Sequence, residues 1–410
     1  MNYVIIGNSA AAVGCIEGIR SVDKTGGITV ISNEPYHVYS RPLISYLIYG
    51  KTDEQRMKYR PDSFYQDNSV TLMADTNVTK VDYERKKVMV DPGEPVAFDK
   101  LLFATGSSPF VPPMAGLDEI QQKFSFMKLD DAKALQTAIN PESRVLIIGA
   151  GLIGLKCAEG ILNKVKSITV VDLAPRILPS ILDETGSEMM QKHIESKGVK
   201  FILSNSVAQF HKDSAELKSG EKLNFDVLVL AVGVRPNTKL AADIGCKVNK
   251  GILSDDHCAT NLDGVYAAGD CSESYDITDD TYRVLALWPN AYMQGETAGI
   301  DMAGGKKVYD KAIPMNAIGF FGLHIITAGS YTGEAYTVKT DSAYKKLVTK
   351  DNLLKGFILI GEIARAGIYT SLIRERTPLD TVDFELIKEK PQLIAFAAKE
   401  RAVKLGGAKA

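Results

Sequence analysis

The sequence predicts an α/β protein with two parallel sheets of the doubly wound kind and a C-terminal α+β region. Two similar segments, about 140 residues apart, carry most of this prediction. The first runs from an apolar stretch at 3–6 through a glycine turn to a second apolar stretch at 28–31. The other runs in the same way from 145–148 to 168–171. An apolar strand, a small-residue turn, a helix and a second strand form a βαβ unit, so two units predict two parallel sheets.

The C-terminal region has a different pattern, which begins at about Tyr336. Short strand-like segments follow one another there, and Asp351-Asn352 is a plausible tight turn between two of them. This pattern predicts a meander followed by helices. The predicted elements are strands at 336–339, 344–349 and 354–360, helices at 364–374 and 391–405, and a frayed end at 406–410.

The amino-acid composition limits the classes of function that the protein can have. The 410-residue chain has a formal net charge of −2, with 45% hydrophobic and 24% charged residues. This excludes wholesale disorder and gives no basis for nucleic-acid binding. Five cysteines without a CxxC pair predict neither a disulfide framework nor a metal site. No apolar run approaches the ~18 residues of a membrane span, and the first residues lack the basic start of a signal peptide, so we expect a cytoplasmic protein.

The second glycine turn fits the full GxGxxG pattern at Gly149, Gly151 and Gly154. Such a turn lets a pyrophosphate approach the backbone and meet the positive end of the helix dipole. The next strand ends at Asp172, near the ~20-residue spacing at which an acid binds an adenosine ribose. Its charge would repel a 2′-phosphate, so NADH is expected rather than NADPH, and Arg176 is expected on the surface. A lone GxGxxG also occurs as a tight packing turn.

The first glycine turn is degenerate. The hexapeptide 7–12 keeps only Gly7 of the three glycines, and the small residues Ser9 and Ala12 occupy the other two places. Small side chains still allow a close approach to the backbone. The following strand ends without an acid. The nearest carboxylate, Glu34, is either a ribose ligand or a solvated loop charge.

Two further segments accompany these turns. Residues 101–107 form an apolar strand that runs into an Ala-Thr-Gly turn, and residues 264–271 form another that contains a Gly-Asp pair. Together with Gly-Val-Arg-Pro-Asn at 233–237, this order of motifs resembles the pyridine nucleotide–disulfide oxidoreductase superfamily. The resemblance implies that the Ala-Thr-Gly turn closes an FAD site and that Asp270 holds the ribityl chain of the flavin. A helix N-cap is the alternative role of Asp270.

The resemblance also implies the domain organisation. An FAD-binding domain is interrupted by an inserted NAD-binding domain, and a C-terminal α+β interface domain with a tail helix follows. The expected segments are 1–112 (FAD), 113–243 (NAD), 244–314 (FAD) and 315–410 (C-terminal).

A further helix is expected to begin at Trp288-Pro289-Asn290 and to run toward Gly299, because proline is favoured in the first turn of a helix. In the family that this chain resembles, the start of this helix points at the flavin, where its dipole stabilises negative charge on the reduced ring. Trp288 either lines the flavin or packs the domain.

Cysteine is absent where the disulfide reductases of this superfamily carry a CxxxxC pair. That region, 39–46, reads Tyr-Ser-Arg-Pro-Leu-Ile-Ser-Tyr. It resembles rubredoxin reductases, ferredoxin reductases and the flavin part of NADH-dependent nitrite reductases. Those enzymes pass a hydride from NADH to flavin N5 and then release single electrons to an iron protein. Cys15 and Cys157 are expected to be inert core thiols, so no dithiol relay is expected.

Lys156 is the candidate catalytic residue. Many relatives carry an acid directly after Gly-Leu in the second glycine motif and a lysine after the Arg-Pro segment. This chain has Lys156 and Tyr46 at those places. If the two meet near the flavin, Lys156 favours its anionic reduced form. Otherwise it is a lysine that extends along its helix toward solvent.

The resemblance implies FAD and NAD(H) as cofactors and a one-electron carrier or iron–sulfur subunit as partner. A basic excess between 343 and 376 is either a docking face or an ordinary solvated surface. The tail helix at 391–405 packs on its own domain, forms a homodimer or docks on a larger complex. The alternatives to an electron-transfer reductase are a peroxide-forming NADH oxidase and an FAD/NAD-binding redox sensor.

The residues expected to contact FAD are Gly7, Ser9, Ala12, Glu34, Arg41, Pro42, Ala104, Thr105, Gly106, Gly269, Asp270, Trp288, Pro289 and Asn290. Those expected to contact NAD are Gly149, Gly151, Ile153, Gly154, Asp172 and Gly233.

Overall fold

The computed structural model describes residues 1–406 and divides into two compact units. Unit 1 contains two parallel sheets, and unit 2 contains an antiparallel sheet with its helices, which confirms the predicted α/β class with a C-terminal α+β region. Within residues 1–406, no helix is both long and apolar enough to cross a membrane. Unit 1 comprises 1–180, 187–274 and 283–309, and unit 2 comprises 181–186, 275–282 and the residues from 310 onward.

The first sheet of unit 1 has five parallel strands in the order β3-β2-β1-β7-β19. Its central strands are buried almost throughout, as expected for a parallel sheet covered on both faces. β19 joins about 160 residues after β7, so chain segments far apart in sequence end at one edge of the sheet. The strands are β1 (Asn2–Ile6), β2 (Gly27–Ile31), β3 (Val70–Met73), β7 (Lys100–Phe103) and β19 (Val265–Ala267).

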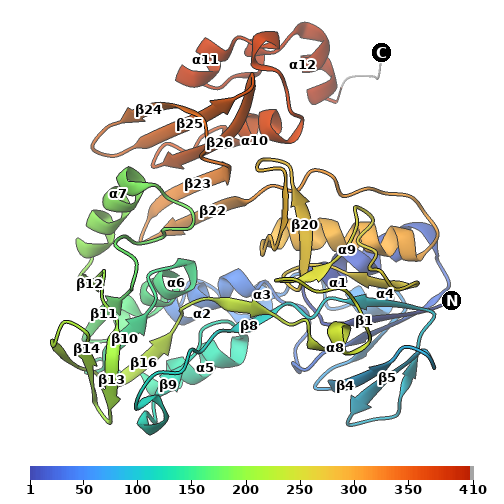
Figure 1. Ribbon diagram of the computed structural model, residues 1–410, viewed down its shortest axis with the longest axis horizontal. Coiled ribbons are helices and arrows are strands. Elements are labelled where there is room, and N and C mark those ends of the chain that lie inside the picture. The colour runs from blue at the N-terminus through green and yellow to red at the C-terminus, as the bar shows by residue number, and fades with distance from the viewer. Residues whose placement is uncertain (407–410) are drawn as a thin grey trace. The chain divides into compact units, whose positions relative to one another are not determined.

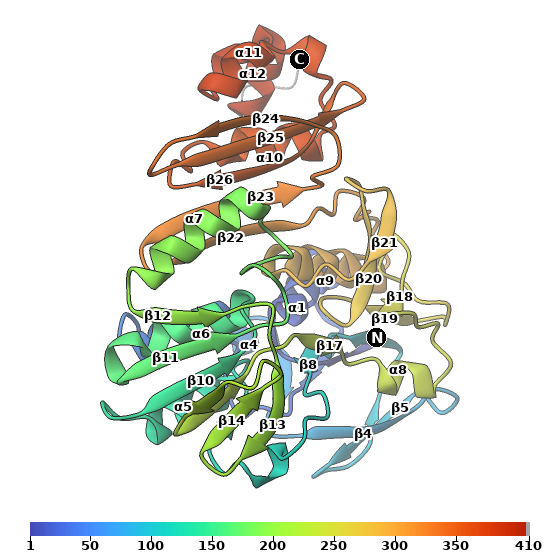
Figure 2. The same cartoon turned by 60° about the vertical axis from the view of Figure 1, so that its left-hand side comes forward.

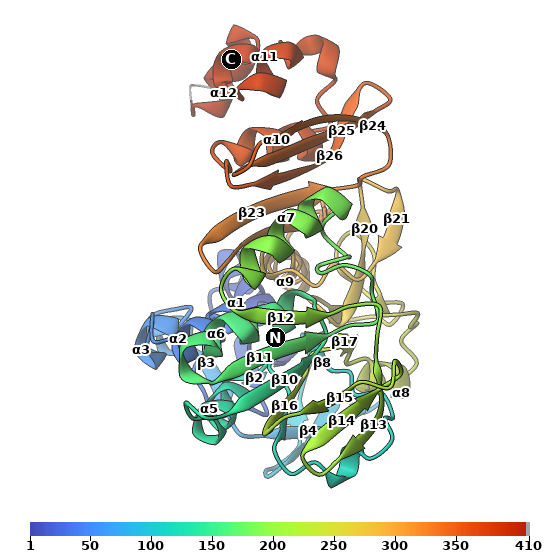
Figure 3. The ribbon, with the colours of Figure 1, turned by 90° about the vertical axis from the view of Figure 1, so that its left-hand side faces the viewer.

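The second sheet repeats this order as β12-β11-β10-β16-β9, again with all strands parallel (Figure 2). Each sheet carries a three-stranded antiparallel insertion before its fourth strand. These are β4-β5-β6 before β7, and β13-β14-β15 before β16 (Figure 3). The strands are β4 (Asn77–Asp82), β5 (Lys87–Asp91), β6 (Val96–Ala97), β9 (Lys123–Phe124), β10 (Arg144–Ile148), β11 (Ser167–Val171), β12 (Val199–Ile202), β13 (Val207–His211), β14 (Ser214–Leu217), β15 (Lys222–Asn224) and β16 (Val227–Leu230).

Two antiparallel strands, β8 and β17, cross between the parts of unit 1 that hold the two sheets. A small mixed sheet, β18-β20-β21, follows the second crossing. These strands are β8 (Ser107–Pro109), β17 (Val234–Pro236), β18 (Ile252–Leu253), β20 (Ser272–Asp276) and β21 (Thr281–Arg283). The helices up to residue 302 are α1 (Ala10–Val22), α2 (Ile44–Tyr49), α3 (Glu54–Met57), α4 (Phe64–Asp67), α5 (Leu129–Ala138), α6 (Leu152–Ile161), α7 (Glu184–Glu195), α8 (Lys239–Asp243) and α9 (Trp288–Met302).

Helices α1 and α9 pack with their backbones in direct contact (Figure 1). A Cβ atom at Gly295 would overlap the carbonyl oxygen of Ala11, and one at Gly14 would overlap the carbonyl oxygen of Tyr292. Only glycine therefore fits at these two positions. The contact fixes the start of α9 beside the start of α1, at the edge where β1 and β19 end.

Unit 2 is built on an antiparallel sheet in the order β22-β23-β26-β25-β24, and α10 packs against β26 (Figure 2). The predicted meander is present, and Asp351 and Asn352 both have positive φ values (53° and 58°) in the turn between β25 and β26. Strands β22 and β23 were not predicted. The elements are β22 (Met315–Phe320), β23 (Leu323–Gly329), β24 (Glu334–Lys339), β25 (Tyr344–Lys350), β26 (Leu353–Ile360), α10 (Ala366–Arg374), α11 (Phe384–Glu389) and α12 (Ala398–Lys404).

The predicted tail helix over 391–405 is wrong. Instead, a 3-10 turn at Leu393–Ala395 and the short helix α12 are separated by Phe396, whose backbone is extended. The extended residue lets both Ala395 and Phe396 enter the core of unit 2, which one continuous helix would not do. The predicted frayed end, beyond Gly406, lies outside the described residues.

Several basic residues of the segment 343–376 have partners within unit 2. Lys346 pairs with Asp183 at 2.8 Å, and Arg376 lies 3.3 Å from Asp280. Lys345 donates hydrogen bonds to the carbonyl oxygens that end α11. These contacts stabilise unit 2 internally, and the choice between a docking face and an ordinary solvated surface stays a prediction.

The close packing of α1 and α9 can be tested by adding one methyl group. Gly295→Ala should lower the free energy of unfolding by about 1–3 kcal/mol, the usual cost of overpacking, because the new Cβ meets backbone that cannot move aside. The matched control is Gly27→Ala at the exposed start of β2, where the nearest atom would lie 3.5 Å away. Chemical denaturation of both variants measures the difference. Equal stability would contradict the packing described here.

Candidate functional site

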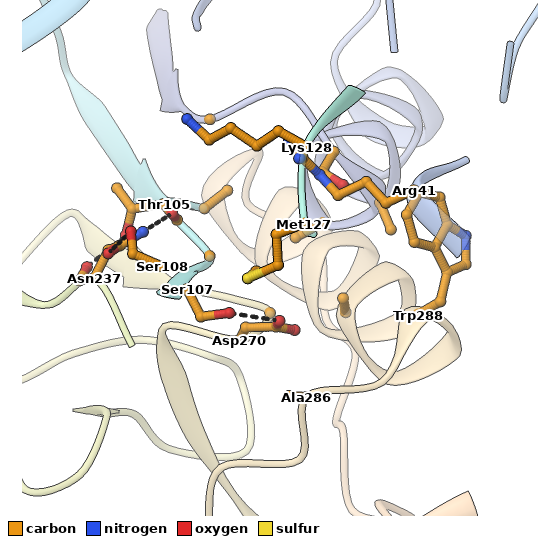
Figure 4. Close-up of a pocket in the computed structure, with 18 of the residues that line it drawn as sticks. Arg41, Thr105, Ser107, Ser108, Met127, Lys128, Asn237, Asp270, Ala286 and Trp288 are labelled. Atoms are coloured by element: carbon orange, nitrogen blue, oxygen red, sulfur yellow. Dashed lines mark hydrogen bonds between the residues drawn. The ribbon is translucent and has the colours of Figure 1, made fainter. Parts of the chain in front are cut away.

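A cavity of about 370 Å³ lies in unit 1 where β1, β7 and β19 end (Figure 4). Ligands of doubly wound sheets bind at the carboxyl ends of the strands, and the volume is within the usual range for small-molecule sites. The turn after each of these strands lines the cavity, as do the starts of α2 and α9 and part of α6. The predicted FAD contacts that line it are Gly7, Ser9, Glu34, Arg41, Pro42, Ala104, Thr105, Gly106, Gly269, Asp270 and Trp288.

The turn between β1 and α1 forms one end of the cavity. Gly7 has a φ of 113°, and a Cβ there would overlap the carbonyl oxygen of Ala104 at the end of β7. Only glycine therefore fits where these two strands end. Ser9 precedes α1, lines the cavity, and its side chain makes no capping hydrogen bond to the first turn of the helix. Ala12 is fully buried and does not line the cavity.

Glu34 is neither exposed nor solvated, since only 6% of it is accessible. Its carboxylate accepts a 2.7 Å hydrogen bond from the Tyr39 hydroxyl and forms an ion pair with Arg41. The Tyr39 hydroxyl in turn accepts a hydrogen bond from the backbone N–H of Leu129 at 3.0 Å. The solvated-loop interpretation of Glu34 is therefore wrong. The carboxylate is a fixed part of the cavity wall, with Arg41 beside it.

Asp270 lies in the turn after β19 and lines the cavity. Its Oδ2 accepts a 3.1 Å hydrogen bond from the Ser107 hydroxyl (Figure 4). Burial raises the pKa of the Asp270 carboxyl, and the Ser107 hydrogen bond and the charge of Arg41 oppose that rise. The next element is strand β20, so the helix N-cap alternative is excluded. Asp270 is half-buried, and a carboxylate with one protein partner has capacity to accept further hydrogen bonds from a ligand.

Residues 105–108 and Asn237 hold each other in place. The Thr105 hydroxyl donates to the Asn237 carbonyl at 2.7 Å, and the Asn237 side-chain amide donates to the Thr105 carbonyl at 2.8 Å. Ser108 adds a hydrogen bond to the Asn237 side chain, also at 2.7 Å. Asn237 lines the cavity, whereas Gly233 instead accepts a hydrogen bond from Phe110 where the two crossing strands meet. The Arg-Pro-Asn motif thus shapes the cavity through its asparagine, which was not predicted.

The second glycine turn, between β10 and α6, is built like the first. Gly149 has a φ of 115°, and a Cβ there would overlap a backbone carbonyl, as would one at Gly154. A Cβ at Gly151 would instead meet nothing within 4 Å, so open space lies in front of the helix N-terminus. Asp172 holds the turn by accepting hydrogen bonds from the N–H groups of Ala150 at 2.6 Å and Ala174 at 2.7 Å. This arrangement leaves room for an anionic group at the start of α6.

Arg176, expected on the surface, is half-buried. Its Nε is buried and has no hydrogen-bond partner among residues 1–406. It follows Asp172 closely in the chain, so a cation lies near the acid that is expected to select NADH.

Helix α6 enters the cavity with Ile153 and Lys156. Lys156 forms an ion pair with the buried Glu159, and its Nζ lies 4.4 Å from the centroid of the Tyr46 ring. Its side chain is only 11% exposed. Lys156 therefore does not extend along the helix toward solvent. It meets the Tyr46 ring, and its role near the flavin stays a prediction.

Helix α9 begins at Trp288, as predicted. Trp288 lines the cavity and also packs edge-to-face on Tyr59, with ring centroids 5.0 Å apart, so its packing role is confirmed and its contact with the flavin stays a prediction. Pro289 is exposed and Asn290 is buried, and neither lines the cavity.

Several cavity residues were not predicted, because they belong to no motif. Lys128 and Met127 precede α5, where the Asp131 carboxylate accepts hydrogen bonds from both of their N–H groups. Ser107 directly follows the Ala-Thr-Gly turn. For Met127 and Lys128, the only sequence signal was the partial capping pattern formed by Asp131 at the start of α5. The lining residues that were not predicted include Ser45, Ser107, Met127, Lys128 and Asn237.

The five cysteines are buried, and none lines the cavity. Burial raises the pKa of each thiol, so thiolates are disfavoured. Cys15 and Cys157 are core thiols, as expected. Cys271, next to Asp270, donates weakly to the carbonyl oxygens of Phe103 and Ala268. Among residues 1–406, no group of three or more His, Cys, Asp or Glu side chains could hold a metal ion.

The chain is similar over most of its length to characterised oxidoreductases. The epsilon subunit of NADH-dependent phenylglyoxylate dehydrogenase from Aromatoleum evansii is 31% identical over 390 residues, or 92% of each chain. The nitrite reductase (NAD(P)H) of Bacillus subtilis (strain 168) is 31% identical over 92% of this chain but only 47% of its own length, so this chain spans about half of it. A chain of the covalent putidaredoxin reductase–putidaredoxin complex has the same fold, with a TM-score of 0.87, 22% identity, and coverage of 95% of this chain and 96% of its own.

The family described as pyridine nucleotide-disulphide oxidoreductase matches residues 1–295, which include both glycine turns, Asp270 and the start of α9. This match covers more than half of the chain. The chain therefore belongs to the pyridine nucleotide-disulphide oxidoreductase family.

Proposed function

We propose that this protein carries electrons between NADH and a separate one-electron carrier, either a rubredoxin-type or iron–sulfur protein or the iron–sulfur subunit of a larger complex. It is an NADH-dependent flavin oxidoreductase that binds FAD and NAD(H). The absence of cysteine from the cavity supports the proposed acceptor class most strongly. Without a thiol to receive them, electrons pass directly from the flavin to an acceptor.

The cavity residues fit FAD. The open N-terminus of α1 after Gly7 and Ser9 suits the pyrophosphate, and Glu34 with Arg41 suits the adenosine side of the molecule. Asp270 and Ser107 suit the hydroxyls of the ribityl chain. Ala12, Pro289 and Asn290 do not line the cavity, so we no longer assign them a contact with FAD.

The second turn fits NAD(H). Its open approach at Gly151 suits the pyrophosphate, and Asp172 at the end of β11 suits the adenosine ribose. Ile153 and Lys156 bring the same helix to the cavity wall. A dinucleotide on α6 and one in the cavity would thus approach each other at these two side chains.

When bound, the flavin accepts a hydride from NADH and can release electrons one at a time. The protein's own contribution is to hold both cofactors, exclude water and keep the ring accessible to a partner. Two similar proteins support this proposal. One is a subunit of an NADH-dependent dehydrogenase, and the other is a reductase whose structure was solved in a covalent complex with putidaredoxin.

The proposed function is tested most directly by comparing the electron acceptors that the protein reduces. Purified holoprotein is mixed with NADH, and turnover with rubredoxin or a viologen dye is compared with oxygen consumption. We expect rapid reduction of the one-electron acceptors and slow use of oxygen. Rapid peroxide formation from oxygen would instead establish an NADH oxidase. Flavin that is reduced by NADH but does not turn over with any acceptor would favour a redox sensor.

Asp270 should be needed for flavin binding. Asp270→Ala should weaken FAD binding roughly 10- to 100-fold, because a hydrogen bond from a hydroxyl to a charged group is worth about 1.5–3 kcal/mol. Fluorescence titration of the apoprotein with FAD measures this. Asp118→Ala, an exposed carboxylate on the 3-10 turn Leu117–Glu119, is the matched control and should bind normally. Wild-type affinity in Asp270→Ala would show that the carboxylate does not contact FAD.

Asp172 should set the preference for NADH. Asp172→Asn removes the charge that repels a 2′-phosphate and keeps one of the two oxygens that accept hydrogen bonds in the turn, and Arg176 remains nearby. We expect the ratio of kcat/KM for NADH to that for NADPH to fall by about tenfold, or about 1.4 kcal/mol. Steady-state kinetics with a viologen dye gives both values, with Asp118→Asn as control. A ratio equal to that of the wild type would show that a residue other than Asp172 selects NADH over NADPH.

A further inference from the structure

Tyr39 carries a buried hydroxyl group that joins two parts of the cavity wall. The residue is 6% exposed. Its hydroxyl donates a 2.7 Å hydrogen bond to Glu34, which lines the cavity, and accepts a 3.0 Å hydrogen bond from the backbone N–H of Leu129. Leu129 is the first residue of α5 and lies 90 residues beyond Tyr39 in the chain. One phenolic oxygen therefore links the loop after β2 to the start of α5.

The hydrogen bonds of this hydroxyl can run in only one direction. The backbone N–H of Leu129 and the guanidinium of Arg41, whose Nη1 lies 3.1 Å from the Tyr39 oxygen, are donors only. The proton of the hydroxyl is therefore directed at Glu34. Burial raises the pKa of the Tyr39 hydroxyl, and the charge of Arg41 does not cancel the rise. Tyr39 thus keeps its proton at neutral pH and continues to donate this hydrogen bond.

The segment that holds the Tyr39 hydroxyl is itself held in place. The two residues before Leu129 line the cavity (Figure 4), and their N–H groups donate to the Asp131 carboxylate. Asp130, in the same turn, accepts a hydrogen bond from the Tyr36 hydroxyl. The Leu129 N–H is therefore a fixed donor, and it keeps the Tyr39 hydroxyl in one place.

Glu34 is held by its two partners and can still accept a ligand. Arg41 pairs with its Oε1 and Tyr39 with its Oε2, so the plane of the carboxylate is set. Each carboxylate oxygen can accept about two hydrogen bonds. Glu34 lines the cavity, and 7% of its side chain remains accessible. A carboxylate that is oriented before a ligand binds does not have to be ordered by the ligand, which favours affinity.

We propose that Tyr39 is a positioning residue for FAD, which orients the Glu34 carboxylate for the adenosine side of the cofactor. This inference rests on the proposed placement of FAD in the cavity. Tyr39 itself does not line the cavity, so it acts through Glu34. Without the hydroxyl, Arg41 alone would hold the carboxylate, and FAD would have to order it on binding.

The test is fluorescence titration of the apoprotein with FAD and, separately, with FMN, which lacks the adenosine half. Tyr39→Phe removes only the hydroxyl, and it should weaken FAD binding about tenfold, the loss expected for one hydrogen bond. Its affinity for FMN should equal that of the wild type. Tyr83→Phe, which removes a hydroxyl that donates to the Asp263 carbonyl outside the cavity, is the matched control. Equal weakening for both flavins, as a general loss of structure would cause, or wild-type FAD affinity would overturn the positioning role.

A double-mutant cycle shows whether Tyr39 acts through Glu34. If it does, Tyr39→Phe/Glu34→Gln should bind FAD no more weakly than Glu34→Gln alone, because the second change already alters the group that Tyr39 orients. Losses of affinity that add would show an independent role for Tyr39 and would contradict the proposal.

Asp270→Ala distinguishes a failure of this inference from a failure of the cofactor placement. If Asp270→Ala weakens FAD binding and Tyr39→Phe does not, FAD occupies the cavity and only the positioning role is wrong. If neither variant changes the affinity for FAD, the placement of FAD in the cavity is wrong, and the inference is wrong with it. Only binding is measured, so the result does not depend on the electron acceptor.

Discussion

The site depends on close backbone contact where three parallel strands end. Gly7 lies against the carbonyl group of Ala104, and Gly295 lies against that of Ala11. These contacts bring the turns after β1, β7 and β19 together with the starts of α1 and α9. The cavity residues come from chain positions as far apart as 7 and 291, so only this convergence makes them neighbours. Larger side chains at either glycine would separate the elements that form the wall.

The polar groups in this wall divide into those the protein satisfies and those it leaves to a ligand. Glu34 is held by Tyr39 and Arg41, and Thr105 is engaged by Asn237. Asp270 has one protein donor. A buried polar group without its full set of partners destabilises the empty protein, and a bound cofactor removes that penalty. The satisfied groups shape the site, and we propose that Asp270, with its one protein donor, is among the groups that hold the cofactor.

Sequence patterns predicted the parts of the fold that follow a strict local rule. The strand–glycine–helix repeats at Gly7 and Gly149 predicted both parallel sheets, since a buried strand followed by such a turn has few alternatives. Strands β22 and β23 were missed, because their alternation is weak. The tail was predicted as one helix, because its apolar spacing is helical. Tertiary packing of Phe396 into the core overrides that local preference.

The same limit applies to the site. Asp270 and most of the turn residues were found because each belongs to a motif with its own chemistry. Ser45, Lys128 and Asn237 reach the cavity through the placement of whole elements, which no local pattern specifies. The environment of Glu34 was also unpredictable, because its partner Arg41 is fixed by the path of the loop between β2 and α2. Lys156 was recognised only as a departure from related sequences, and the structure supplied its partners.

The most direct measurement is a crystal structure of the protein with FAD and NADH bound. The account predicts a flavin in the cavity, with Asp270 and Ser107 along its ribityl chain. The nicotinamide should lie beside Ile153 and Lys156. A flavin bound elsewhere, or a nicotinamide that approaches from a side remote from α6, would contradict it.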